Sequence, residues 1–412
     1  MAEVAAGPGA LVAHTTRLDA DVDLLLPGGP LFEGPDLGLA GTADAVRVDL
    51  PTGPGRVGAA ADVVAEVLSA IPVEDEVGRP GTGPVAFCAL PFDDDAPATA
   101  LVPATVLARS ADGARWMTTI GPPGAPKRLL AHGGPGLGAP SSFTVRPTRS
   151  PASWCDAVRA ARDLVRQGEL AKVVLAREVV VEGDAPFPVH QLVARLRDSY
   201  PAAFRFAVDG LVGASPELLV ARTGETVRSH PMAGTAPRSA DPSTDARLAA
   251  SLLASTKDRV EHQITIDFVL DELLPFCSYL DAEAEPSIVA MANVQHLATL
   301  VQGRLSSPPA SALALAGALH PTPAVCGSPR EAARAAIARL EGFDRGRYAG
   351  PVGWVDARGD GAFAVAIRSA ELAGPRAVLR AGVGVVADSD PDTELAESRS
   401  KLAALLGALV SP

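Results

Sequence analysis

Two pairs of carboxylates in this sequence have a spacing that could bind a metal ion. Asp258 and Glu261 lie three residues apart in KDRVEHQ (257–263), and Glu394 and Glu397 repeat that spacing near the C-terminus. Residues three or four apart share one face of a helix, so each helix could direct two carboxylates at one point. Facing helices of this kind form an all-oxygen site suited to Mg²⁺. The same spacing also fits exposed helix faces with ordinary ion pairs, such as Glu397 with Lys401.

Lys172 and Glu217 are candidates for proton transfer. Only four of the 36 basic residues are lysine, at positions 127, 172, 257 and 401, and the rest are arginine. Arginine keeps its proton in proteins, whereas a buried lysine can lose it and act as a base, so this scarcity favours a function for Lys172. Glu217 follows Ser-Pro between apolar residues, and a half-buried carboxyl tends to have a raised pKa and can donate a proton. Both residues could instead lie exposed at strand ends.

Several other residues could bind an anionic substrate. Gly234 and Thr235 form a turn in HPMAGTAPR (230–238) that could present backbone N–H groups. His320 opens a similar loop, HPTPAVCG (320–327). Arg368, in AVAIRSA, could grip a carboxylate with two hydrogen bonds, and Gly382 permits a close backbone approach. Taken singly, each of them could also be structural.

Composition limits the classes of function. The chain has 412 residues and a net charge of −12, which argues against nucleic-acid binding. An anionic substrate is compatible only if local positive groups overcome the overall field, so we expect a metal or buried cations in the site. No apolar run is long enough to span a membrane, and the N-terminus does not resemble a signal peptide. The four cysteines lie far apart, which predicts neither a zinc site nor disulfides and favours a cytoplasmic location.

The periodicity of apolar residues predicts many short strands and a few helices. Helices are expected at 55–71, 150–170, 187–199, 243–275 and 391–410. Strands are expected at 83–92, 98–110, 113–121, 171–183, 204–210, 217–224, 296–305, 350–357, 361–372 and 377–382. The glycine-rich stretch 127–143 is interpreted as a loop and an internal boundary. Without strict βαβ alternation, this order indicates an α+β fold with mainly antiparallel sheets and helices outside.

Taken together, the segments resemble the chorismate-utilising family, which includes isochorismate, salicylate, anthranilate and aminodeoxychorismate synthases. The matching pieces include LAKVVLAR (170–177), GASPELLV (213–220), HPMAGTAPR, STKDRVEH (255–262), HLATLVQG (296–303), LHPTPAVCG (319–327), VAIRSAEL (365–372), AGVGVVADSDP (381–391) and ELAESRSKL (394–402). The resemblance implies two packed, mainly antiparallel β-sheets flanked by helices, as in anthranilate synthase component I. It assigns residues 150–412 to a chorismate-binding catalytic region and 1–145 to a variable N-terminal part of the same fold.

The resemblance also implies roles for single residues. Mg²⁺ would be bound by Glu261 and Glu397, with Asp258 and Glu394 as further metal-site carboxylates. The substrate chorismate would be held by Gly234, Thr235, His320, Tyr348, Arg368, Gly382 and Lys401. We expect a monomer or weak dimer with no nucleic-acid or membrane partner.

Residue identity within the family favours isochorismate synthase. Lys172 matches the general base that activates water, and Glu217 matches the general acid. Ala233 stands where some aminodeoxychorismate synthases carry a nucleophilic lysine. The expected reaction is therefore water attack at C2 of chorismate with loss of the C4 hydroxyl, in a menaquinone or siderophore pathway. The alternatives are a salicylate synthase, an anthranilate synthase component I and an inactive chorismate-binding subunit.

Overall fold

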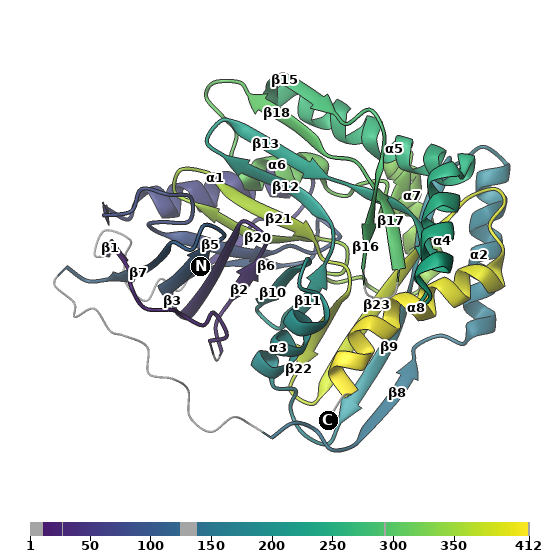
Figure 1. Cartoon of the computed structure of the whole chain (residues 1–412), viewed down its shortest axis with the longest axis horizontal. Coiled ribbons are helices and arrows are strands. Elements are labelled where there is room, and N and C mark those ends of the chain that lie inside the picture. Colours follow the sequence, from purple (N-terminus) through teal and green to yellow (C-terminus); the bar gives the residue numbers. More distant parts are fainter. Residues whose placement is uncertain (1–10, 27, 124–137, 292–293, 411–412) are drawn as a thin grey trace.

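The protein combines eight helices with two sets of hydrogen-bonded strands among its described residues (Figure 1). This computed structural model describes residues 11–26, 28–123, 138–291 and 294–410. Twenty of the described strands join into one network and three form a second sheet. Apart from the pairing of β1 with β4, the pairings between described strands are antiparallel. The α+β fold with mainly antiparallel sheets is confirmed.

The large network consists of two halves joined by a long pairing of β3 with β6. One half follows the order β15 (Cys277–Ala282), β18 (Val301–Leu305), β13 (Thr226–His230), β12 (Leu218–Thr223), β21 (Gly361–Val365), β20 (Pro351–Asp356), β5 (Val85–Ala89) and β6 (Ala98–Ser110). The other follows β3 (Leu37–Leu50), β2 (Leu31–Glu33), β10 (Phe204–Val208), β11 (Leu211–Ser215), β22 (Ser369–Ala373), β23 (Arg376–Val385) and β9 (Lys172–Gly183). The two expected sheets are thus continuous through hydrogen bonds.

Shorter strands complete these sheets. Beside β6 lie β7 (Arg115–Gly121), β1 (Val12–Arg17) and β4 (Val73–Asp75), and along β9 lie β8 (Phe143–Pro147) and β19 (Gly327–Ser328). The second sheet has the order β14 (Met232–Pro237), β17 (Val294–Ala298) and β16 (Ser287–Ala290).

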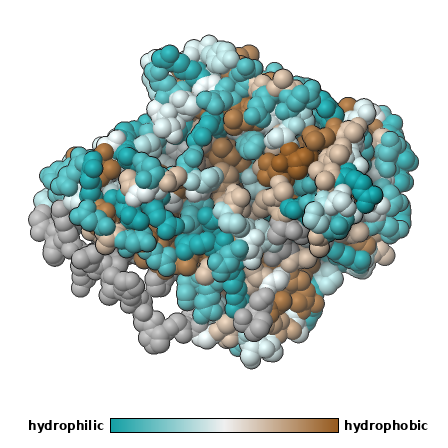
Figure 2. Space-filling view, in the orientation of Figure 1, coloured by the Kyte–Doolittle hydropathy of each residue, from teal (hydrophilic) through white to brown (hydrophobic). Residues whose placement is uncertain are grey.

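The helices cover the sheets. They are α1 (Arg56–Ser69), α2 (Pro151–Arg166), α3 (Val189–Ser199), α4 (Pro242–Ala254), α5 (Thr256–Leu273), α6 (Ala312–Leu319), α7 (Arg330–Glu341) and α8 (Pro391–Val410), with a 3₁₀ turn, η2 (Leu274–Phe276). Figure 1 shows α8, in yellow, lying against β23 and β9. Hydrophilic residues cover most of the face drawn in Figure 2, with apolar patches near its middle. Within the described residues, no helix is long and apolar enough to cross a membrane.

Local sequence explains why the elements that carry the candidate residues form. β9 begins at Lys172 and is rich in β-branched residues, which favour a pleated strand. α2 begins after Ser150, whose hydroxyl accepts a hydrogen bond from the backbone N–H of Ser153, with Pro151 in the first turn. The N-terminus of α8 is capped by Asp390, which accepts from the Thr393 N–H at 2.9 Å.

The expected helix at 243–275 is wrong, because the chain breaks between α4 and α5. Ser255 has an extended backbone (φ −70°, ψ 109°), and its hydroxyl accepts the N–H of Asp258 to cap α5. An N-cap serine satisfies a donor that would otherwise lack a partner at the start of a helix. Apolar residues do not define the buried face of α5: Val260 is 58% exposed, and polar His262 and Thr265 are buried.

Two expected strands are each divided in two. Residues 296–305 belong partly to β17 of the small sheet and partly to β18 of the large network. Residues 361–372 form β21 and β22, interrupted near Arg368, whose φ is +52°. Left-handed backbone is unfavourable for a side chain with a Cβ and cannot continue a strand. The expected loop at 127–143 lies largely outside the described residues, since residues 124–137 are not described.

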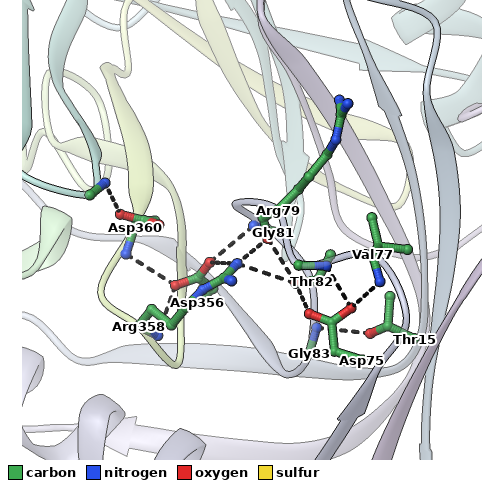
Figure 3. Close-up of polar contacts among 12 residues, drawn as sticks. Thr15, Asp75, Val77, Arg79, Gly81, Thr82, Gly83, Asp356, Arg358 and Asp360 are labelled. Carbon is green, nitrogen blue, oxygen red and sulfur yellow. Dashed lines mark hydrogen bonds and ion pairs between the residues drawn. The ribbon is translucent and has the colours of Figure 1, made fainter.

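N-terminal and C-terminal segments are tied together by polar contacts as well as by strand pairing (Figure 3). Asp356, at the end of β20, accepts hydrogen bonds from the backbone N–H groups of Gly81 and Asp360, each at 3.0 Å. In the same loop as Gly81, the hydroxyl of Thr82 donates to Asp75 at 2.5 Å. Because Asp356 is buried, these backbone donors stabilise its charge and fix the loop against the β20–β21 turn.

A buried ion pair beside β9 contributes to the stability of this region, and its contribution can be tested. Arg345 and Glu341 are each about 1% exposed, with Arg345 Nη2 2.5 Å from Glu341 Oε1. Arg345 also donates to the carbonyl of Val174 at 2.8 Å, and Glu341 accepts the N–H of Ala176 at 2.7 Å. The pair therefore anchors β9, the strand that begins at Lys172.

We expect Glu341→Ala to lower the free energy of unfolding by about 3–5 kcal/mol, because it leaves a buried guanidinium without its counter-charge. Urea unfolding would measure the loss. The matched control is Glu225→Ala, which removes the exposed partner of Arg304 and should cost less than about 1 kcal/mol. Equal losses in the two variants would contradict the anchoring role.

Candidate active site

A pocket of about 260 Å³ lies where α5 and α8 meet the sheets. It is lined by most of the residues singled out from the sequence: Glu217, Gly234, Thr235, Asp258, Glu261, Tyr348, Arg368, Gly382, Glu394, Glu397 and Lys401. Lys172 does not itself line the pocket, but it contacts Glu261, which does. Residues separated by more than 200 positions in the sequence thus surround one cavity.

The first two turns of two helices bring the carboxylate pairs to the pocket. Asp258 and Glu261 come from the start of α5, and Glu394 and Glu397 come from the start of α8. Glu261 Oε1 lies 2.7 Å from Lys172 Nζ, and Glu397 Oε1 lies 2.7 Å from Lys401 Nζ. Each of these two glutamates therefore faces a lysine ammonium on one of its oxygens.

The charge of the pocket is dominated by these carboxylates. Burial and the neighbouring Glu397 raise the pKa of Glu394 to about 7. Burial alone would raise the pKa of Glu261 as well, but the charge and hydrogen bond of Lys172 outweigh it and the pKa is lowered. Burial and like charge therefore disfavour the ionised form of Glu394, whereas Lys172 stabilises the ionised form of Glu261.

An oxygen-rich set of this kind fits a hard divalent cation such as Mg²⁺. Four carboxylates from two helices face one cavity, and the raised pKa of Glu394 marks negative charge that a cation would stabilise. In the parts of the chain that are described, no three His, Cys, Asp or Glu side chains already form a close metal-binding group. A metal would therefore have to compete with the lysines for Glu261 and Glu397.

Lys172 and Glu217 are both buried, at 1% and 2% exposure. The alternative of exposed strand ends is therefore wrong for both. Burial raises the pKa of Glu217 to about 7, although the charges of Lys172, Arg368 and Lys401 oppose the rise. A carboxyl with this pKa is partly protonated at neutral pH and can donate a proton.

A second group of contacts involves the backbone of β23. Tyr348 Oη accepts the backbone N–H of Gly382 at 2.7 Å, and Lys401 Nζ donates to the Gly382 carbonyl at 3.0 Å. Gly382 has no room for a side chain, since a Cβ would lie 2.9 Å from Val174 Cγ1. The backbone of β23 is therefore part of the pocket wall.

Arg368 is held at the pocket by a residue that was not selected from the sequence. His296 Nε2 lies 3.5 Å from Arg368 Nη2, and His296 Nδ1 lies 3.2 Å from the Gly234 carbonyl. Burial and the charge of Arg368 lower the pKa of His296 to about 3, so the ring is neutral. Since the guanidinium only donates, Nε2 is the acceptor and the ring proton is on Nδ1.

His320 is not where it was expected. It is absent from the pocket lining, and its Nε2 lies 3.0 Å from the carbonyl of Phe92. Its ring also packs edge-on against the Phe92 ring. The prediction that His320 binds substrate is therefore corrected: its polar atom is occupied in packing the N-terminal part against the loop before α7.

Sequence reasoning missed other lining residues besides His296, among them Lys257, Ala324 and Thr393. His296 lies in HLATLVQG and Lys257 in STKDRVEH, two of the segments that carried the family resemblance. Membership of those segments was the signal available for both. Ala324 likewise lies in LHPTPAVCG, another of these segments, whereas nothing in the local pattern marks Thr393.

Comparisons with known proteins agree with this arrangement. The family model described as "Chorismate binding enzyme" matches residues 137–410. The Mycobacterium tuberculosis H37Rv protein named "Putative isochorismate synthase MenF" is 45% identical over 346 residues, which cover 80% of this chain and 88% of the relative. The chain belongs to the chorismate-binding enzyme family.

Other members of the chorismate-binding family extend the match. Isochorismate synthase DhbC of Bacillus subtilis is 38% identical over 337 residues, covering 79% of this chain and 81% of that protein. The crystal structure of DhbC from Bacillus anthracis has a TM-score of 0.78 at 33% identity, over 94% of this chain and 97% of the other. All residues that line the pocket fall within the matched range 137–410.

Gly384 offers a test of the pocket as a binding site. A Cβ at Gly384 would lie 2.8 Å from Glu261 Oε1 and 2.9 Å from Lys172 Cε. We expect Gly384→Ala to displace both side chains and weaken chorismate binding about tenfold or more, because a methyl group forced into a packed site costs about 1–3 kcal/mol. Titration calorimetry in the presence of Mg²⁺ would measure the affinity.

The control is Gly58→Ala in α1, where a Cβ would contact nothing within 4 Å. That variant should bind as the wild type does. Unchanged affinity in Gly384→Ala, with a normal thermal transition, would exclude this pocket as the binding site.

Proposed function

We propose that the chain is an isochorismate synthase that converts chorismate to isochorismate in the presence of Mg²⁺. The observation that carries the proposal is the convergence of a buried amine, a buried carboxyl of raised pKa and four further carboxylates on one pocket. The names of the relatives support the same reaction. We assign residues 150–412 to the catalytic region and residues 1–145 to a variable part of the same fold.

Lys172 and Glu217 carry the proton transfers in this proposal. Lys172, in its uncharged form, takes a proton from a water molecule as the water oxygen bonds to C2 of chorismate. Both ring double bonds shift, the bond from C4 to its hydroxyl breaks, and Glu217 gives its proton to the departing hydroxyl, which leaves as water. Addition and loss of one water balance, so the reaction is an isomerisation.

The remaining residues orient the substrate. Arg368, fixed by His296, and the Tyr348–Gly382–Lys401 group would bind the substrate carboxylates by charge and hydrogen bonds. Glu261, Glu397, Asp258 and Glu394 would hold Mg²⁺, which would offset their charge and bind a substrate carboxylate when present. Holding the substrate ring between Lys172 and Glu217 increases the reaction rate, because the reacting groups are already oriented.

The ion pair of Lys172 with Glu261 bears directly on the base. Glu261 Oε1 lies 2.7 Å from Lys172 Nζ and so engages the amine that this proposal uses as the base. Lys172 therefore becomes a competent base only when Glu261 is engaged elsewhere. The activity of Lys172 as a base therefore depends on what Glu261 binds.

Rival reactions share the same acid and base. A salicylate synthase would go on to release pyruvate from isochorismate, and an anthranilate synthase component I would use ammonia. A chain that binds chorismate but does not turn it over would be an inactive subunit. Separating the products formed from chorismate distinguishes all four cases.

We expect purified protein to form isochorismate only when Mg²⁺ is present, and Lys172→Ala or Glu217→Gln to lower kcat by about 10²–10⁴-fold. Each variant removes one of the two proton-transfer groups. Chromatography of the reaction mixture measures the product and the rate. Asp267→Asn, at an exposed position of α5 outside the pocket, serves as the control and should keep full activity.

Salicylate with pyruvate as the end product would replace the proposed function by the lyase alternative. Turnover close to that of the wild type in either Lys172→Ala or Glu217→Gln would remove that residue from the mechanism.

The pKa of Glu217 predicts the alkaline side of the pH profile. An acid catalyst works only while protonated, so kcat/KM should fall about tenfold per pH unit above a pH of about 7. Initial rates at low chorismate between pH 5.5 and 9 in steps of roughly half a unit measure this limb. Returning each sample to neutral pH controls for unfolding. A profile that stays level to pH 9 would contradict the assignment of Glu217.

A further inference from the structure

Three of the four lysines in the chain surround one pocket. Lys257 and Lys401 line it, and Lys172 contacts Glu261, which also lines it. The fourth, Lys127, lies outside the described residues. The chain uses arginine at its remaining basic positions. The clustering of the few lysines therefore indicates that the pocket requires lysine.

Lys257 differs from the other two in its partners. Lys172 and Lys401 are largely buried and each contacts a glutamate at 2.7 Å. Lys257 is exposed, and among the described residues it forms no ion pair with a carboxylate. Its charge nevertheless reaches the pocket: after burial and Glu397, which raise the pKa of Glu394, Lys257 is among the groups that oppose the rise.

The position of Lys257 has no explanation in helix stability. It is the second residue of α5, next to Asp258. The positive end of the helix dipole disfavours a cation in the first turn, by about 0.3–1 kcal/mol at an exposed site. A lysine kept at such a position, at the rim of a pocket and without a partner in the described chain, points to a ligand of negative charge.

We propose that Lys257 captures the dianionic substrate at the mouth of the pocket. This inference rests on the proposed function, since chorismate carries two carboxylates. The chain as a whole repels such a ligand, with a net charge of −12. Lys257 presents a positive charge to solvent before the substrate reaches the buried cations Lys401 and Arg368.

Capture at the mouth acts on entry and leaves the chemical step unchanged. Lys172 and Glu217 act on the reacting atoms, whereas Lys257 changes only the local potential met by the approaching substrate. Its loss should therefore lower kcat/KM and leave kcat nearly constant. The effect should also weaken with salt, because exposed charges are screened by ions.

The test compares Lys257→Met and Lys257→Arg with the wild type at saturating Mg²⁺, from about 0.02 to 0.5 M ionic strength. We expect Lys257→Met to lower kcat/KM about tenfold at low salt and less than about twofold at high salt, with kcat within about twofold throughout. Lys257→Arg keeps the charge and should stay close to the wild type. Arg259→Met is the matched control, since Arg259 lies exposed on the same helix, pairs with Glu285 and does not line the pocket.

Binding separates this inference from the proposed reaction. Titration calorimetry with chorismate should show weaker, less salt-dependent binding for Lys257→Met than for the wild type. If the wild type forms no isochorismate, the proposed function fails, yet the calorimetry still decides the capture role. A fall in kcat equal to that in kcat/KM, a loss independent of salt, or the same loss in Arg259→Met would overturn the inference.

Discussion

The arrangement of the active site depends on keeping opposite charges together in a region shielded from water. An ion moved from water into a protein interior costs several kcal/mol unless a partner and hydrogen bonds compensate. Lys172 is almost fully buried, and its compensation comes from Glu261 on α5. Lys401 and Glu397 form a second ion pair, within α8. The Lys172–Glu261 pair therefore fixes α5 against β9, and the hydrogen bond from Lys401 to the Gly382 carbonyl fixes α8 against β23.

The backbone must let these side chains approach. β9 and β23 pair along their length, and Gly384 lies opposite Val174, two residues after Lys172. Any side chain at Gly384 would occupy the space of the Lys172–Glu261 contact. On the other side of β9, Arg345 and Glu341 bind its backbone at Val174 and Ala176. Lys172 is thus placed by a strand held from both sides, which limits the freedom of the amine relative to Glu217.

The sequence predicted the parts of this site that follow from local spacing and from family segments. The carboxylate pairs could be found because three-residue spacing places them on one helix face, and strong β-branched patterning revealed β9. The break at Ser255 was missed because capping depends on one hydroxyl contact that apolar periodicity does not reveal. All four N-terminal strands β1 to β4 were missed because their pattern is weak and their pairing is with distant segments, such as β2 with β10. His320 was misplaced because its loop resembles a ligand-binding turn, whereas its partner, the Phe92 carbonyl, lies 228 positions away in sequence.

Arg368 shows why the pocket departs from regular strand geometry. A continuous strand from β21 to β22 would alternate its side chains strictly between the two faces of the sheet. The left-handed backbone at Arg368 interrupts that alternation, at a cost of about 1–2 kcal/mol for a residue with a Cβ. What compensates is local: the Arg368 carbonyl accepts the N–H of Ala214, and His296 contacts the guanidinium. The neutral state of His296 belongs to the same arrangement, because a protonated ring would place a second positive charge beside Arg368 and leave no acceptor for it. One requirement therefore explains these features: a fixed positive charge must face the cavity from the sheet. It accounts for the strained backbone of Arg368, for the neutral state of His296 and for the position of the guanidinium.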